Sequence, residues 1–337
     1  MIEQSSELAS KLRTYSGFPS PPTVAIKLIE LAKQADPNIR EVVSVVELDS
    51  VLTLKILRLA NSARYLQRRK SATVCRALVM MGVNAALTVG LSFSLLECLP
   101  DSKSNGLDHK IFWRRSLLSA VAARCMGELL KSQSGDELFM TALLQDVGIL
   151  ALANAEPGLY DGILSSDTDH YDLVKHEQAL AKCDHAEVTA FLLGSWNLPA
   201  RVISAIAESH RPSRVSAKTE SDQFHAIVAL SGLFADLFIR KQDSASVERV
   251  ARICQQLLGL DKSFVGWILD RIRDVMPDTE EMFGMELVRE PEKLVAQALQ
   301  LMQVIEAESA AFAENRLAPS ISERIESEGR MRRRLEA

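Results

Sequence analysis

Apolar residues recur every three or four positions along most of the chain, which is the period of an amphipathic α-helix. The first run follows Pro21-Pro22, which suit the first turn of a helix, and stops at Asp36-Pro37-Asn38. Two more apolar faces lie within residues 42–48 and 53–59. The sequence has no long alternating runs joined by hairpin turns. The pattern therefore predicts an all-α protein.

A polar stretch at residues 100–108 is the strongest internal boundary, because Pro, Gly, Asn, Asp and Ser cluster there. Helical spacing resumes at Phe112. It continues through residues 117–130, 137–153, 176–196, 200–210, 224–240 and 257–276. These runs predict a second helical unit that reaches to about residue 285.

The last part of the chain has a different pattern. Two apolar rows repeat every seven positions, and their members are Leu287, Leu294 and Leu301 and, beside them, Val288, Val295 and Met302. A helix with such a stripe must bury it against something. The residues after Pro319 are rich in charge and cannot build a core of their own. We expect residues 286–337 to form a helical extension that packs back to about Phe312 and then leads to a protein partner, a further domain or a second copy in a homodimer.

Residues 77–96 carry no charge and are long enough to cross a bilayer. Polar residues and the glycines Gly82 and Gly90 divide this stretch, which favours one buried helix or two short ones. The N-terminus lacks an export signal, and the five cysteines are scattered without a C-x-x-C pair. A formal charge of −5 leaves no broad basic field for a nucleic acid. We expect a cytoplasmic protein with no membrane span and no nucleic-acid partner.

The short motifs of several enzyme classes are absent. The sequence contains no phosphate-binding glycine loop of the two common kinds and no G-x-S-x-G nucleophile elbow. Asp146 and the histidines lie in separate predicted helices. Any site must therefore be assembled by the fold.

Four segments, taken together and in order, resemble the HDOD family, the HD-related output domains of bacterial signalling proteins. They are Phe18–Ala25, Leu57–Ala63 (LRLANSA), Phe112–Ser116 with Ala142–Gly148, and Asp184–Glu187 with Trp196–Pro199, Ala205–Ala207 and His210–Pro212. The resemblance covers roughly residues 15–240. It implies a two-lobed helical fold, with an N-terminal lobe at 1–106, a degenerate HD-type lobe at 107–285 and an extension or linker at 286–337.

The resemblance also implies descent from HD phosphohydrolases, whose metal sites gather histidines and aspartates from several helices. Arg115 stands at the position of the first histidine, and Gln145-Asp146 at the position of the His-Asp pair. A guanidinium repels a cation, and an amide is a poor replacement for imidazole at a transition metal. We expect Arg115 to replace the metal and to pair with Asp146 by a charge-assisted hydrogen bond.

Further positions of the HD pattern are only partly filled. His185 and His210 match positions where additional histidines occur, whereas the late aspartate falls at Gly232, with Asp236 one turn on. Three potential ligands, Asp146 among them, then remain of about six. We therefore expect no metal, no other cofactor and no catalytic residue.

Other residues have less specific interpretations. Asn61, Ser62 and Trp113 are candidate contacts for a ligand or partner, although a helix end explains the first two and a core position explains the tryptophan. Asp184 followed by Glu187 is typical of a helix start. The histidines without a pattern, which we expect at the surface, are His109, His170, His176 and His225.

Two functions compete at this point. The first is a non-enzymatic regulatory module that binds a protein partner or a small ligand and relays to an output domain, often a GGDEF-type diguanylate cyclase in proteins that this chain resembles. The second is a residual metal-dependent phosphohydrolase acting on nucleotides or cyclic dinucleotides through Asp146, His185 and His210. The low number of intact ligands favours the first.

Overall fold

The computed structural model describes residues 23–34, 36–61, 71–97, 108–132, 134–161, 163, 168–211, 219–240, 242–305 and 307. These residues form helices and connections without a strand, which confirms the all-α prediction. Most of the expected boundary at 100–108 lies outside them, as do Ser62 and the tail beyond residue 307.

The N-terminal lobe contains five helices among the described residues. They are α2 (Thr23–Ala32), α3 (Ile39–Val46), α4 (Ser50–Ala60), α5 (Val74–Met81) and α6 (Val83–Glu97). Side chains that precede a helix accept hydrogen bonds from its first free amides, as Asn38 does at α3, Asp49 at α4 and Thr73 at α5. Helix α6 packs against α2 in its own lobe and against α8 of the second lobe, so it joins the two.

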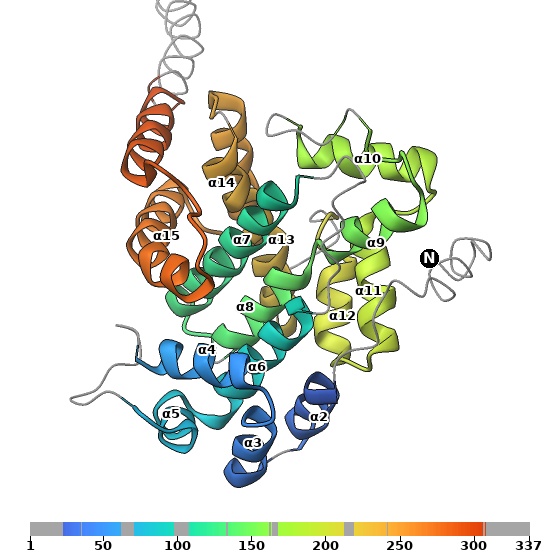
Figure 1. Cartoon of the computed structure of the whole chain (residues 1–337). Helices are drawn as coiled ribbons and strands as arrows, with labels where there is room; N and C mark the ends of the chain where they lie inside the picture. The colour runs from blue at the N-terminus through green and yellow to red at the C-terminus, as the bar shows by residue number, and fades with distance from the viewer. Residues whose placement is uncertain are drawn as a thin grey trace, which may run out of the picture.

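The second lobe is built around two long helices that pack along each other, α7 (His109–Leu129) and α13 (Glu220–Ile239). Around them lie α8 (Gly135–Leu144), α9 (Val147–Ala155), α10 (His170–Leu180), α11 (His185–Ser195), α12 (Ala200–Ala207), α14 (Ser244–Leu258) and α15 (Lys262–Phe283). Figure 1 shows α2–α6 below this lobe, with α15 on one side and α10–α12 on the other.

Three of the helical runs expected from the sequence each contain two helices, and for one of them the helix start expected at Asp184 already marks the break. The run 137–153 breaks between α8 and α9 at Gln145-Asp146, and the run 176–196 breaks between α10 and α11. In the run 257–276, Gly259 ends α14 in a left-handed conformation with φ of 68°.

One large core connects both lobes. Its buried side chains come from α2–α6 and also from α7, α8 and α11–α15. A smaller cluster fills the space around α9, α10 and α11 and includes Phe112, Leu150 and Tyr160. The division into lobes at 1–106 and 107–285 stays a prediction. The hydrophobic core runs across that boundary.

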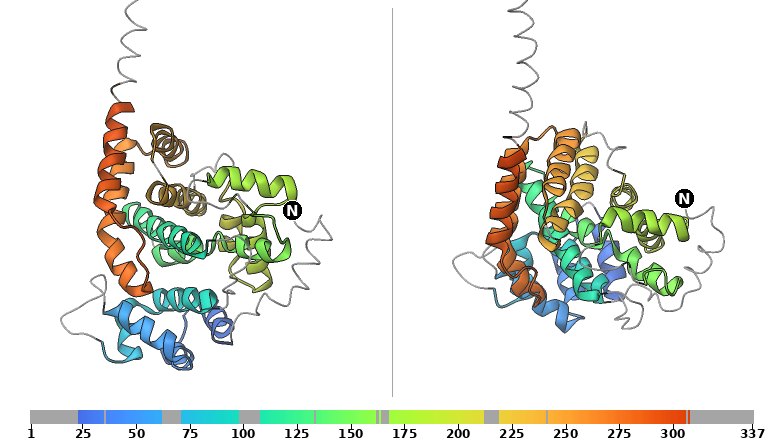
Figure 2. Two further views of the ribbon diagram at one scale, coloured as in Figure 1. Left: turned by 45° about the horizontal axis from the view of Figure 1, so that its top comes forward. Right: turned by 90° about the horizontal axis from the view of Figure 1, so that it is seen from above.

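The extension begins with residues 291–305, which are helical and lie alongside α15. Figure 2 shows this segment in red along one side of the molecule. Of the two predicted rows, Leu287, Val288, Val295 and Met302 are buried, and Leu294 and Leu301 are partly buried against the core. Leu299 lies so close to Gly266 of α15 that a Cβ there would be 2.9 Å from its Cδ2 atom.

Two described stretches are long and apolar enough to cross a membrane by length and composition, Gly135–Ala155 and Glu220–Ile239. Their most apolar windows are 89% and 67% buried inside the protein. The uncharged stretch expected to be one buried helix or two short ones is two, because the chain turns by 113° at Gly82 between α5 and α6. The absence of a membrane span stays a prediction.

Candidate functional site

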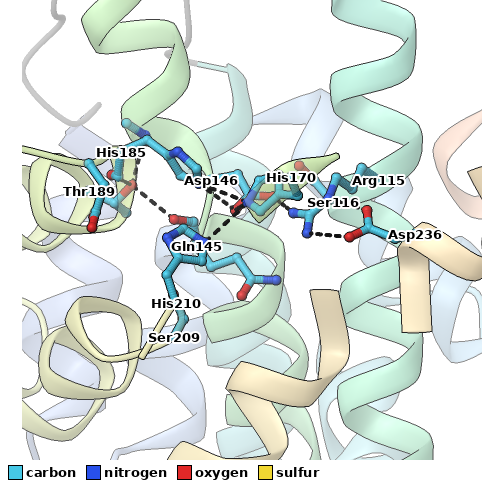
Figure 3. Close-up of polar contacts among 12 residues, drawn as sticks. Arg115, Ser116, Gln145, Asp146, His170, His185, Thr189, Ser209, His210 and Asp236 are labelled. Carbon is cyan, nitrogen blue, oxygen red and sulfur yellow. Dashed lines mark hydrogen bonds and ion pairs between the residues drawn. The ribbon is translucent and has the colours of Figure 1, made fainter. Parts of the chain in front are cut away.

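A buried guanidinium joins three helices at the centre of the second lobe. Arg115 of α7 donates from Nη1 to Asp146 Oδ2 and from Nε to Asp236 Oδ1, the latter at 2.8 Å (Figure 3). A longer bond of 3.4 Å runs from Nη2 to Asp236 Oδ2. Burial disfavours the charge on Arg115, but the two carboxylates outweigh it and raise its pKa. The expected contact of Arg115 with Asp146 is present, and Asp236 is a second partner.

Gly232 leaves the space that this guanidinium occupies. A Cβ at position 232 would lie 2.7 Å from Nη2 and 3.5 Å from Cζ of Arg115. Gly232 lies one turn before Asp236 on α13, so the small residue and the carboxylate act on the same side chain. The position matched to the late aspartate thus holds a glycine that makes room for Arg115, and Asp236, one turn on, supplies the carboxylate that binds it.

Three imidazoles converge on the other oxygen of Asp146. His185 Nε2 is 3.0 Å from His170 Nε2, which is 3.1 Å from His210 Nε2. Asp146 Oδ1 lies 3.4 Å from the Nε2 atom of His185 and 3.7 Å from that of His170. This oxygen is buried and has no hydrogen-bond partner among the described residues. The Asp146 carboxylate thus turns Oδ2 to Arg115 and Oδ1 to the histidines.

The prediction that His170 is a surface residue is wrong. Its side chain is 12% exposed and packs edge-on against the rings of His185 and His210, at centroid distances of 4.7 and 5.0 Å. Asp169 caps the start of α10 and so fixes the position of His170, the first residue of that helix. His170 and Glu177 lie seven positions apart, with buried Leu173 and Val174 between them, so one face of α10 carries all four residues.

Glu177 orients His185 through Nδ1, the ring nitrogen that does not face the other histidines. Its Oε2 accepts from the His185 backbone amide at 2.8 Å and lies 2.7 Å from Nδ1 of the same residue. Its Oε1 accepts from the buried Tyr160 hydroxyl at 2.6 Å. A carboxylate on one imidazole nitrogen fixes the other nitrogen toward the site, as is common behind metal-binding histidines.

The charges within the cluster shift the histidines in opposite directions. Burial lowers the pKa of His185, but Glu177 and Asp146 outweigh it and raise the pKa to about 10. Burial and the neighbouring His185 lower the pKa of His210 to about 3. Burial and Arg115 hold the pKa of His170 well below its usual value.

The backbones of α9 and α11 touch beside the cluster. A Cβ on Gly148 would lie 2.0 Å from the carbonyl oxygen of His185, so only glycine fits. Thr189 links the same helices, since its hydroxyl donates to the carbonyls of Gln145 and His185 and accepts from the Gly148 amide at 2.7 Å.

Four side chains in this arrangement, those of Asp146, His170, His185 and His210, could hold a divalent metal ion. Their facing atoms all lie within 4.8 Å of one another. A metal bound at 2.0–2.1 Å by tetrahedral ligands separates the ligand atoms by about 3.4 Å. Four of the six separations, 3.0, 3.1, 3.4 and 3.7 Å, bracket this value, and all six lie within 4.8 Å. Asp146 Oδ1, which faces the histidines without a hydrogen bond, and the Glu177 carboxylate on the far nitrogen of His185 also suit such a site. Sequence reasoning counted three of these ligands and missed His170.

The remaining predicted site residues have structural roles here. Gln145 Nε2 donates to Ser231 at 3.4 Å and lies outside the ligand set. Asn61 ends α4 and exchanges two hydrogen bonds with the backbone of Ser71, at 2.6 and 2.9 Å. Trp113 packs against the smaller core cluster. Asp184 caps α11 as expected. The other three histidines, His109, His176 and His225, are half-buried, and His176 contacts the Leu159 carbonyl.

Comparison with known proteins agrees with this architecture. An HDOD domain protein of unknown function from Geobacter sulfurreducens is 20% identical, with a TM-score of 0.66 over 83% of this chain and 99% of that one. A protein from Shewanella amazonensis SB2B, named as a candidate phosphohydrolase, is 21% identical, with a TM-score of 0.64 over 82% of this chain and 97% of that one.

A longer relative is an uncharacterised protein of Treponema pallidum (strain Nichols), 21% identical over 215 residues. The match covers 61% of this chain and 40% of that relative, so this chain spans less than half of its length. The family model of the HDOD domain matches residues 18–212, more than half of the chain. The chain belongs to the HDOD family.

Proposed function

We propose that this chain is a non-enzymatic regulatory module, which receives a signal through a protein partner or small ligand and passes it on through the helix at 291–305. The observation that carries the proposal is the position of Arg115 between Asp146 and Asp236. Metal-dependent hydrolysis requires carboxylates that are free to hold the metal and a coordination position open to water. Arg115 occupies Oδ2 of Asp146 and both oxygens of Asp236, and its fixed charge disfavours a cation between these two carboxylates.

The histidine cluster supports a structural role. If a divalent metal binds, Asp146, His170, His185 and His210 would hold it. Bound there, it would supply a fixed positive charge and tie together the chain segments that carry the four ligands. Four protein ligands complete a closed structural site, whereas catalytic sites keep one position for water. The near-complete burial of Asp146 and His185, at 1% and 0% exposure, also favours a structural role over turnover.

The route of the signal follows α7. Arg115 faces the cluster, whereas its neighbour Arg114 donates from Nε to the Leu287 carbonyl at 2.5 Å. Glu280 Oε1 accepts from the Leu287 amide at 2.6 Å. The start of the extension is thus bonded to the helix that also carries the central guanidinium. We propose that a partner domain, a cyclase of the GGDEF type or a second copy of this chain, reads the position of this extension, in a cytoplasmic protein without a membrane span.

The test measures hydrolysis and metal content on the same preparation. Protein purified without chelator is assayed with bis-p-nitrophenyl phosphate and a cyclic dinucleotide in the presence of Mn²⁺, Mg²⁺, Fe²⁺ or Zn²⁺, with Asp146→Ala as control. We expect no turnover above that control, whatever the metal content. Turnover that the wild type shows and Asp146→Ala lacks would favour the second candidate, a residual phosphohydrolase. The convergence of four side chains of metal-binding type is the observation that supports this candidate.

A further inference from the structure

We propose that a groove between α7, the end of α13 and the start of the extension binds a small phosphate-bearing molecule of nucleotide size. The inference rests on the proposed function as a ligand-responsive module and names the site and class of its ligand. The groove is separate from the histidine cluster, although it borders the same stretch of α7. It has a volume of about 460 Å³, within the usual range for small-molecule pockets.

Basic side chains line both walls of the groove. On α7, Lys110 and Arg114 lie one helical turn apart, and neither makes an ion pair with a described residue. On the opposite wall, Arg289 and Lys293 also lie four positions apart and contact the exposed carboxylates of neighbouring residues, Glu286 at 3.7 Å and Glu290 at 3.2 Å. Four cations against two carboxylates leave a net charge of +2 in the groove.

This excess charge favours a dianion. Arg289 and Lys293 are 85% and 73% exposed, so water screens their charges, and the half-buried Arg114 is the least screened of the four cations. Arg114 uses Nε for the Leu287 carbonyl, so its terminal nitrogens remain for two phosphate oxygens, the geometry in which a guanidinium binds phosphate well. Lys110, one turn away on the rim, adds a mobile point charge.

The floor of the groove is apolar. It is formed by Phe238, which is 3% exposed, with Val288 and the half-buried Leu294 beside it. Phe238 and Val288 are already covered by the protein, so the exposed part of Leu294 is the apolar surface that a ring attached to the phosphate would cover and a free phosphate ion would not. The size, the charge and the floor together point to a phosphate ester with a flat or aliphatic part.

Occupancy of the groove would act on the extension. Its two walls belong to α7 and to residues 286–297, so a bound dianion holds the extension against the lobe by ligating both. A molecule that binds only the docked arrangement stabilises it by mass action. The ligand would therefore favour the docked position of the extension.

Isothermal titration calorimetry with AMP tests the proposal, since AMP combines a dianionic phosphate with a ring. Adenosine supplies the ring alone and inorganic phosphate supplies the anion alone. We expect AMP to bind, phosphate to bind more weakly and adenosine to show no binding. Lys110→Glu should weaken AMP at least tenfold, and it leaves the helix start intact because Asp108 caps α7 through the backbone amide of residue 110.

Lys33→Glu is the matched control, because Lys33 is an exposed lysine outside the groove and the change in net charge is the same. Absence of AMP binding, equal binding of adenosine, or equal weakening by both variants would overturn the inference. Chromatography of the titrated sample separates it from the proposed function: AMP that is bound but converted to adenosine contradicts the non-enzymatic proposal, whereas AMP that is intact and unbound contradicts only the groove.

Discussion

Replacing Gly232 by alanine should destabilise the protein when Arg115 is present and stabilise it when Arg115 is replaced by methionine. In the interior of a helix, alanine is more favourable than glycine by about 0.8–1.0 kcal/mol. Gly232 lies well inside α13, but its Cβ would be 2.7 Å from Nη2 of Arg115. The guanidinium cannot simply swing away, because Asp146 and Asp236 both hold it in a largely buried position.

The expected magnitude follows from the bonds at risk. Displacing the guanidinium weakens the 2.8 Å and 3.4 Å bonds to Asp236, and hydrogen bonds to charged groups contribute about 1.5–3 kcal/mol. After the helical gain is subtracted, Gly232→Ala should lower the free energy of unfolding by about 1–2 kcal/mol. In an Arg115→Met background the clash is gone, and the same substitution should raise it by up to about 1 kcal/mol.

Chemical denaturation followed by circular dichroism on the four proteins of this cycle measures both effects. The difference between the two backgrounds should be about 2 kcal/mol, well above the usual departure from additivity of distant sites. A stabilising Gly232→Ala in the wild-type background, equal to that with Arg115→Met, would refute the placement of the guanidinium beside α13.

Three more outcomes are expected. Arg115→Met should cost about 3–5 kcal/mol because it leaves buried carboxylates uncompensated, and adding Asp146→Asn should cost less than the sum of the two; additive losses in a denaturation cycle would contradict this. Thermal stability of metal-free protein should peak near the ordinary histidine pKa of 6.5. Acid favours unfolding through His210, whose pKa is lowered to about 3, and through His170, whose pKa is also lowered, whereas alkali favours it through His185, whose pKa is raised to about 10. His210→Gln should reduce the slope of the acid limb by at most about 1.4 kcal/mol per pH unit and leave the contribution of His170. Asn61→Ala should speed hydrogen exchange at the end of α4 while sparing α13, because it removes two local bonds.

The helical character of the fold was predictable because apolar spacing reports burial directly. Breaks within a run were harder to see. At Gln145-Asp146 and at residues 181–184 the chain changes direction while still burying apolar side chains on both sides, so the period of the pattern does not register the turn. At the second break Asp184 predicted the helix start correctly, because a side chain that caps α11 must follow the end of α10.

The candidate site was predictable only where the family pattern has a position. Arg115 and Asp146 were expected to meet, and they do. His170 has no such position, and its neighbours along the chain are polar. Its helical face, shared with Leu173 and Glu177, was the available signal, since a charged residue aligned with apolar ones predicts a buried polar contact. No sequence pattern could have placed that face against His185.

The close crossing at Gly148 means that the candidate site has one rigid edge and one adaptable edge. Asp146 and His185 are spaced by backbone lying on backbone, so no exchange of side chains in the surrounding core can widen or narrow that edge. His170 is placed instead by side chains of α10, such as Leu173 and Val174, whose size could change gradually. Over evolutionary time the first edge would be kept or lost in a single step, whereas the second could drift and retune the same cluster for a different cation or for none.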